Sequence, residues 1–227
     1  MLVPLFVGGV VVRVKTSSSS HLSEDRVSIT PTRPEIHALL QALTSNSTEI
    51  ATGIWQAIGT DPTRFADYAS PQGKVDPWAS VAIGLLMQRL DALTAHDWWV
   101  EGLALAYSWI ADASVLAAQR RLANDPPDVD SALKHLQNAR RVGAVYFFEA
   151  NRLQGDLLVA LAADAPEAGQ RQIAASELAL WRHNLANQVQ VGAFFSWLMT
   201  NGARTRGGLD ARYSAILDTG RMAANAL

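Results

Sequence analysis

The chain has no cysteine among its 227 residues. That absence excludes disulfides, thiol nucleophiles and thiolate metal sites together, and it is compatible with any redox compartment. A strong charge of either sign is also missing, because 19 basic and 21 acidic residues leave a formal net charge of -2. Such a balance favours neither nucleic acid nor an anionic membrane surface as a partner.

Motifs that carry chemistry are equally scarce. The glycine pairs at 8–9 and 207–208 lack the Lys-Ser or Lys-Thr flank of a phosphate-binding loop, and no serine stands in a nucleophile elbow. None of the five histidines belongs to a Glu-x-x-His or His-x-x-x-His pair, the spacing that puts two metal ligands on one helical face. The sequence therefore predicts neither a catalytic residue nor a metal site, favours a protein that is not an enzyme, and identifies no cofactor.

The chain is rich in hydrophobic residues. Hydrophobic residues make up 49% of it and charged residues 18%, which excludes intrinsic disorder and leads us to expect an interface. The apolar run 98–118 contains Glu101 and Asp112, so insertion into a membrane is not expected. Residues 1–15 have no basic residue ahead of their apolar stretch and no clear cleavage motif after it, so we expect mature chain and a cytoplasmic protein.

The N-terminal region predicts a short strand and an arm. The run Val10–Val14, with Arg13 and Lys15 at alternating positions, is typical of one short strand or a tight hairpin. Residues 16–33 are rich in Ser, Thr and Pro and predict a linker or an arm on the surface. We therefore divide the chain into a strand and arm over 1–33 and a helical domain over 34–227.

Helical periodicity dominates the rest of the chain. Asp76-Pro77 is a start signal, an N-cap followed by proline at the first helical position. The predicted helices cover about 34–45, 49–59, 77–95, 98–124, 128–163, 166–199 and 209–226. Residues 98–124 are apolar almost all round at first and predict a central helix. The fold class is all-α, an antiparallel up-and-down bundle of six or seven helices, two of them about 34 residues long.

The two long helices are expected to form a hairpin that turns at Asp164–Pro166. Similar segments around Gly143 and Gly192 would then lie level with each other, because positions that sum to about 335 are opposite in such a hairpin. Two glycines at the same height would let the helix backbones approach closely. This arrangement is a packing hypothesis.

Polar residues embedded in apolar helix are the candidate site. The candidates are Glu101, Asp112, Glu149 and Arg152, with the rings of Trp109, Tyr146 and Trp181 as candidates for contact with a ligand. A buried carboxylate must be paired or neutralised, so one interpretation is interhelical ion pairs that fix the packing register. The other interpretation is a pocket that holds carboxyl groups of raised pKa beside aromatic rings.

Two functions follow from these patterns. The first is a non-catalytic interaction or scaffold protein, either self-assembling or an accessory subunit of a larger complex. It draws on the apolar excess, the long helices, and a strand at 10–14 that has no obvious partner in its own chain. The alternative is a helical bundle that binds a hydrophobic or aromatic small molecule or cofactor, which would allow an enzyme.

Overall fold

The computed structural model describes residues 10–14, 27–45, 47–59, 76–92, 97–143, 145–185, 188–191 and 194–197. The chain divides into two compact units, Met1–Trp197 and Leu198–Leu227, and every described residue belongs to the first. The helix predicted over 209–226 lies outside the described residues. The division predicted at residue 33 stays a prediction.

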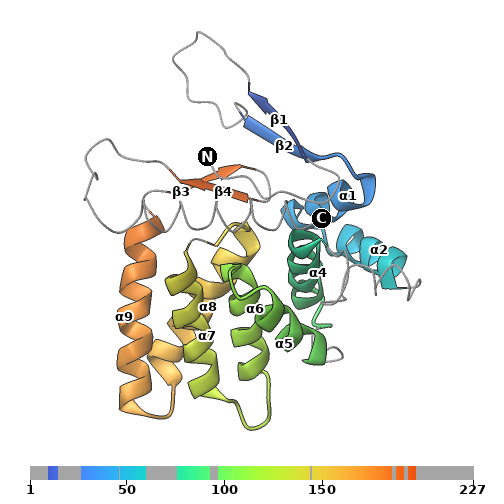
Figure 1. Ribbon diagram of the computed structural model, residues 1–227. Helices are drawn as coiled ribbons and strands as arrows, with labels where there is room; N and C mark the ends of the chain where they lie inside the picture. The colour runs from blue at the N-terminus through green and yellow to red at the C-terminus, as the bar shows by residue number, and fades with distance from the viewer. Residues whose placement is uncertain are drawn as a thin grey trace. The chain divides into compact units, whose positions relative to one another are not determined.

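Eight helices and two antiparallel strand pairs account for the described residues (Figure 1). The helices are α1 (Pro34–Thr44), α2 (Thr48–Gly59), α4 (Pro77–Arg89), α5 (Asp97–Ala106), α6 (Ala111–Leu122), α7 (Val129–Val142), α8 (Phe148–Asp164) and α9 (Ala168–Leu185). The strands are β1 (Val10–Val14), β2 (Val27–Pro31), β3 (Gln188–Val191) and β4 (Phe194–Trp197). The prediction of a mostly helical protein is confirmed.

Three helices begin where local sequence signals place them. Pro34 is the first residue of α1, at a position where the missing proline N–H costs nothing. The Ser47 hydroxyl accepts a hydrogen bond of 3.3 Å from the backbone N–H of Ile50 at the start of α2. Asp76 caps α4 by accepting from the backbone N–H groups of Trp78 and Ala79 at 3.0 and 3.1 Å. Helix α4 then ends at Arg89, short of the predicted residue 95.

The central helix predicted over 98–124 is wrong as one element, because the chain turns at residues 107–110 and forms α5 and α6. A straight helix that is apolar all round cannot bury every face unless it is surrounded. The turn lets α5 and α6 pack on each other and buries both Trp99 and Ile110 completely. The first eight residues of α6, Ala111–Ala118, are all buried, so the central position holds for this part of the run.

Both predicted helices of about 34 residues are wrong in length. The first divides into α7 and α8 at Gly143, whose φ of 146° lies in a region that L side chains rarely adopt. The second ends at Leu185, and β3 and β4 pair antiparallel after it, with Gln188 opposite Trp197 and Val191 opposite Phe194. The alternating Gln-Val-Gln-Val of β3 and the aromatic residues of β4 favour strands over helix.

The long helical hairpin predicted to bring Gly143 level with Gly192 is wrong, because Gly143 ends α7 and α9 ends at Leu185; Gly192 itself lies outside the described residues. The turn at 164–166 is confirmed, and α8 and α9 form a helical hairpin around it. Its close approach is at Gly155, where an added Cβ would lie 2.5 Å from the ring of Trp181. The glycine that allows close packing in this hairpin is therefore Gly155 and not Gly143.

The strand at 10–14 has a partner in its own chain. β1 pairs antiparallel with β2, from Val10 opposite Pro31 to Val14 opposite Val27. Residues 16–33 were predicted to be a linker or an arm, and they contain this second strand. An unpaired strand at 10–14 therefore does not support self-assembly.

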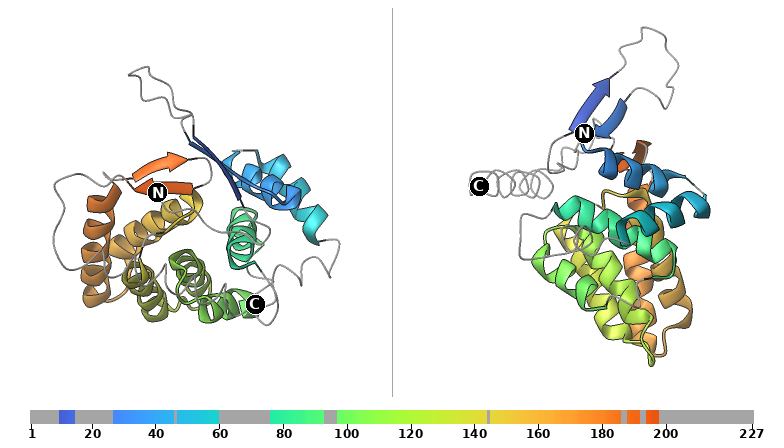
Figure 2. Two further views of the ribbon diagram at one scale, coloured as in Figure 1. Left: turned by 45° about the horizontal axis from the view of Figure 1, so that its top comes forward. Right: turned by 90° about the vertical axis from the view of Figure 1, so that its right-hand side faces the viewer.

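Two hydrophobic clusters form the core. The larger one joins α1, α4, α5, α6 and the start of α8, and the smaller one lies among α6, α7, α8 and α9. The last four helices pack as two neighbouring hairpins, α6 with α7 and α8 with α9 (Figures 1 and 2). Among the described helices, none combines the length and the hydrophobicity needed to cross a membrane.

Candidate functional site

Four of the seven candidate residues come together at the start of α8. Asp112, from the first turn of α6, is completely buried. It accepts hydrogen bonds from the backbone N–H of Tyr146, at 3.1 Å to each carboxyl oxygen, and from that of Phe147 at 2.9 Å. Glu149 and Arg152 follow in the first turns of α8. Asp112 therefore anchors the segment that leads into α8.

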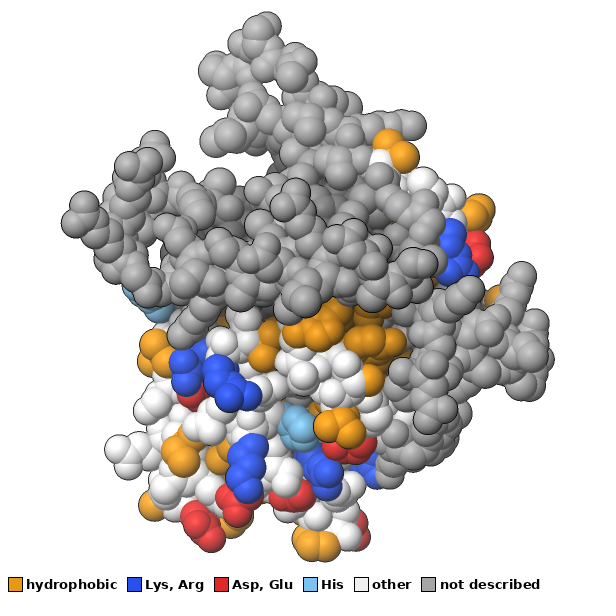
Figure 3. Space-filling model, in the orientation of Figure 1, with side chains coloured by type: hydrophobic (Ala, Val, Ile, Leu, Met, Phe, Trp, Pro, Cys, Tyr) orange, Lys and Arg blue, Asp and Glu red, His pale blue; other side chains and the backbone are white. Residues whose placement is uncertain are grey.

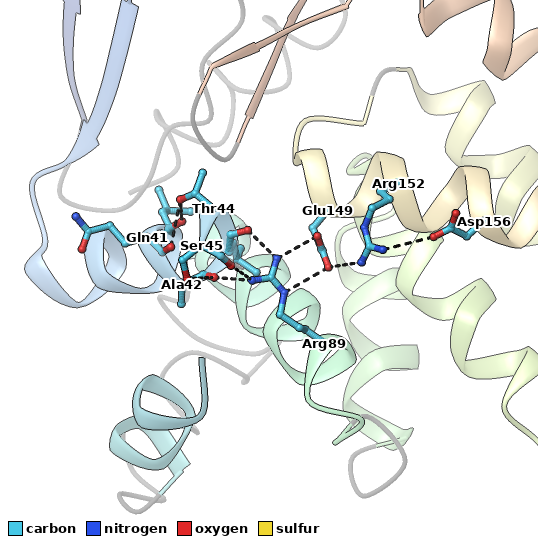
Figure 4. A network of polar contacts seen from close by, with 10 residues as sticks. Gln41, Ala42, Thr44, Ser45, Arg89, Glu149, Arg152 and Asp156 are labelled. Atoms are coloured by element: carbon cyan, nitrogen blue, oxygen red, sulfur yellow. Dashed lines mark hydrogen bonds and ion pairs between the residues drawn. The ribbon is translucent and has the colours of Figure 1, made fainter. Parts of the chain in front are cut away.

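Glu149 is held by two guanidinium groups (Figure 4). Its carboxylate is buried, 3.1 Å from Nη2 of Arg89 and 2.8 Å from Nη2 of Arg152. Arg152 also lies 3.7 Å from Asp156 one turn further along α8. A carboxylate in the first turn of a helix is further stabilised by the helix dipole.

Arg89 is the residue that the sequence did not reveal. Its guanidinium donates to the backbone carbonyls of Ala42 at 2.6 Å, Leu43 at 2.7 Å and Ser45 at 2.8 Å, which close the C-terminal end of α1. With Glu149, these contacts join α1, α4 and α8 through one side chain (Figure 4). The available signal was a lone arginine that ends an otherwise apolar helix, where a charge needs partners.

The pKa values of these two buried carboxyl groups shift in opposite directions. Burial raises the pKa of Glu149, but hydrogen bonds and charge from Arg152 and Arg89 outweigh it and leave the pKa below its usual range. Burial raises the pKa of Asp112 to about 7, against the lowering effect of the N–H groups of Phe147 and Tyr146. Asp112 can therefore exchange a proton near neutral pH, while Glu149 stays charged.

Aromatic rings gather around Trp78, and among them is the ring of Tyr146, whose backbone N–H binds Asp112. Tyr146 meets Trp78 edge to face at 4.8 Å between ring centroids, and Trp109 meets the same indole at 5.8 Å. Tyr107 stands edge-on to Trp109 at 6.5 Å. Burial, and secondly the charge of Asp76, raises the pKa of Tyr107. Trp109 therefore reaches the candidate group through Trp78, a residue not among the sequence candidates.

Glu101 belongs to a different, half-exposed cluster. Its carboxylate lies 2.8 Å from Nε of Arg121 and 4.0 Å from Nε2 of His135, and Arg121 also lies 3.6 Å from Asp128. Burial lowers the pKa of His135 more than the charge of Glu101 raises it. These contacts tie α5, α6 and α7 together and do not involve Asp112.

Trp181 is a packing residue in the α8–α9 hairpin. Its indole Nε1–H donates to the side-chain oxygen of Asn151 at 3.0 Å, and its ring lies against the backbone at Gly155. The structure thus separates Glu101 and Trp181 from the group at the start of α8. Among the described residues there is no set of three His, Asp or Glu side chains that could hold a metal ion.

The fold and the buried polar contacts define a mostly helical domain in which carboxyl groups join helices. Residues 38–204 match the model of a family described as the Y4kD C-terminal domain, and the chain belongs to this family. The match begins inside α1, so β1 and β2 precede it. The comparisons with curated proteins and with solved structures found no match.

Proposed function

We propose that this chain is a non-catalytic helical interaction protein that assembles with copies of itself or as an accessory subunit of a larger complex. The observation that carries the proposal is how its buried carboxyl groups are used. Asp112 binds backbone N–H groups, Glu149 binds two arginines, and Glu177 lies 2.6 Å from Nε of Arg140. Each of these groups joins one helix to another helix or to the segment that leads into it, which is a structural use of buried carboxyl groups.

Exposed apolar side chains supply the complementary support. Large hydrophobic residues stand exposed on several described helices and on the turn between α5 and α6: Ile50, Leu105, Trp109, Phe148, Val159, Ile173, Leu180 and Leu185. Figure 3 shows hydrophobic side chains exposed among charged ones on the described part of one face. Single exposed residues are normal on a protein surface. Leu105 is 83% exposed and Trp109 is 43% exposed, so contact with a partner would remove a large apolar side chain from water at each position.

Native mass spectrometry of the full chain, with light scattering over a range of concentrations, tests the proposal. It predicts an assembly larger than one chain, with dissociation on dilution if the assembly is weak. A chain that stays monomeric at every concentration would remove self-assembly, and the proposal would then need an accessory role with a separate partner. The cytoplasmic location expected from the sequence remains part of the proposal.

The alternative function, binding of a hydrophobic or aromatic small molecule, is favoured by one observation. Trp109 is partly exposed, its ring and that of Tyr146 contact Trp78, and the backbone N–H of Tyr146 binds Asp112, a carboxyl group with a raised pKa. Such a combination is common in ligand sites and also in cores. The same mass spectra decide between the two, because a co-purifying small molecule released on unfolding would favour the alternative.

A further inference from the structure

A short link without helical structure connects α7 to α8 and is defined here as residues 143 and 145–147. It joins the α6–α7 hairpin to the α8–α9 hairpin (Figure 1). Tyr146 and Phe147 of the link are buried in the larger hydrophobic cluster, whereas the smaller cluster, which lies among the four helices of the two hairpins, contains no residue of the link. The link can therefore leave the interior without breaking the contacts of the smaller cluster.

Asp112 of α6 fastens the link by its backbone. Its Oδ1 atom accepts hydrogen bonds from the N–H groups of both Tyr146 and Phe147, at 3.1 and 2.9 Å, and its Oδ2 atom accepts from the N–H of Tyr146 at 3.1 Å. Because Oδ1 alone reaches both N–H groups, a proton on Oδ2 leaves both residues bound. A neutral Asp112 can therefore hold the link closed on α6.

No cation balances Asp112 among the residues whose side chains the structure describes. Burial and the N–H groups of Phe147, Tyr146 and Asp112 itself set its pKa, which is about 7. The other charged or titratable groups on α6, and on the elements packed against it, have partners elsewhere or are at least partly exposed. In the order α4, α5, α6, α7 and α8, with the turns beside them, they are Asp76, Arg89, Glu101, Tyr107, Arg120, Arg121, Asp128, Asp130, Lys134, His135, Arg140, Arg141, Glu149, Arg152, Asp156 and Asp164.

We propose that the link is a proton-controlled joint between the two hairpins: a proton on Asp112 favours the link closed on α6, and loss of that proton to water favours its local opening. An ionised Asp112 inside the closed joint is a buried charge surrounded only by dipoles, and water solvates a carboxylate better. Opening also takes the ring of Tyr146 away from Trp78, which it meets at 4.8 Å between centroids in the closed form. The joint is a property of the single chain, so it goes beyond the proposed function and does not depend on it.

The difference between the two forms in proton affinity sets the size of the effect. Asp112 releases its proton near pH 7 in the closed form and near its ordinary pKa of 3.8 once water surrounds it. Between these values the open form has lost a proton that the closed form keeps. The ratio of open to closed joints therefore rises about tenfold for each pH unit and levels off above about pH 7.

Hydrogen exchange of the full chain, measured from pH 5 to 8 and corrected for the intrinsic exchange rate, tests the joint. The protection of the Tyr146 and Phe147 amides should fall about tenfold for each pH unit up to pH 7 and then level off. At pH 7 it should be lower than that of Leu157 and Leu158 in α8 and should hardly change in dilute urea, because a local opening exposes little surface. Protection that does not change with pH, or equal protection and equal urea dependence at all four residues, would overturn the proposal.

Two variants test whether Asp112 is the group that carries the proton. D112N keeps one side-chain oxygen that can accept from both N–H groups but has no titratable proton, so protection at residues 146 and 147 should no longer depend on pH. E149Q is the matched control, because it removes the other buried acid at the start of α8 and leaves Asp112 in place, and it should keep the tenfold dependence. Persistence of that dependence in D112N, or its loss in E149Q, would overturn the proposal. Should D112N fail to fold, the wild-type measurements decide the proposal by themselves.

Discussion

Asp112 in the first turn of α6 and Glu149 in the first turn of α8 are both buried carboxyl groups, and both contact the start of α8 or lie in it. Glu149 faces the guanidinium groups of Arg89 and Arg152, while Asp112 has backbone N–H donors from Tyr146 and Phe147. Full charges keep the pKa of Glu149 low, and the weaker dipoles around Asp112 leave burial dominant. The difference teaches that the kind of partner, more than burial itself, decides whether a buried acid is charged.

The largest effect is expected on the Glu149 side. R89M removes the guanidinium that binds the carbonyls ending α1 and leaves the buried carboxylate of Glu149 with Arg152 alone. We expect the free energy of unfolding in urea to fall by about 3–5 kcal/mol. The double variant R89M/E149L should lose less than R89M, because the uncompensated charge is removed with its partner. A double variant that is less stable than R89M would contradict this account of the pair.

A pH profile of stability sharpens the contrast. The folded state holds a proton on Asp112 between its ordinary pKa of 3.8 and about 7, where the unfolded chain has released it. The stabilising contribution of this group is therefore full below pH 3.8 and is lost as the pH rises to about 7, by on the order of 4 kcal/mol. Urea unfolding of the wild type and of D112N, compared from pH 4 to 8, measures the loss. A constant gap between them would refute the raised pKa.

Glu149 should show the opposite pH dependence. Its pKa is lowered in the folded state, so its contribution is present above its ordinary pKa of 4.5 and is lost as the pH falls below that value. E149Q, compared with the wild type in the same unfolding series, should therefore differ most at neutral pH and least in acid. A gap that grows on acidification would break the comparison between the two groups.

Removing the Asp112 acceptor tests its anchoring role. D112A leaves the buried N–H groups of Tyr146 and Phe147 without this acceptor and also removes the cost of burying a carboxyl group. We expect a net loss of about 1–3 kcal/mol. The amide protons of residues 146 and 147 should lose protection in hydrogen exchange more than those in the middle of α8. Uniform loss along α8 would show that Asp112 does not act locally.

The smallest effect is expected from R152A. Arg152 is more than half exposed and shares Glu149 with the better-buried Arg89. Solvent screens such a contact, so the loss in unfolding free energy should stay below about 1 kcal/mol. A loss as large as that of R89M would mean that the exposed arginine, and not the buried one, holds the carboxylate.

Much of the local structure was predictable because its causes are local. Pro34 and Asp76-Pro77 mark helix starts, and the turn at 164–166 separates two apolar runs. The grouping of Asp112, Tyr146, Glu149 and Arg152 also agrees with the argument that embedded polar residues need partners.

The remaining features depend on distant contacts. Apolar periodicity continues across residues 107–110 and 143–147, so it cannot show that turning there lets α5 pack on α6 or α8 pack on α6 and α9. Arg89 contacts residues more than 40 positions away on either side, and its own neighbours in sequence give no sign of which they are. β1 and β2 are separated in sequence by residues 15–26, whose composition predicts only a linker, so the sequence does not reveal that the two strands pair.

Carbon-13 NMR titration of the carboxyl groups tests the central contrast most directly, with D112N and E149Q used to assign the two signals. The account predicts that Asp112 titrates near pH 7 and that Glu149 titrates below its ordinary value of 4.5. Titration of both groups near their ordinary pKa values would contradict it. So would the reverse order, because the arginine-paired acid would then be the one that holds its proton.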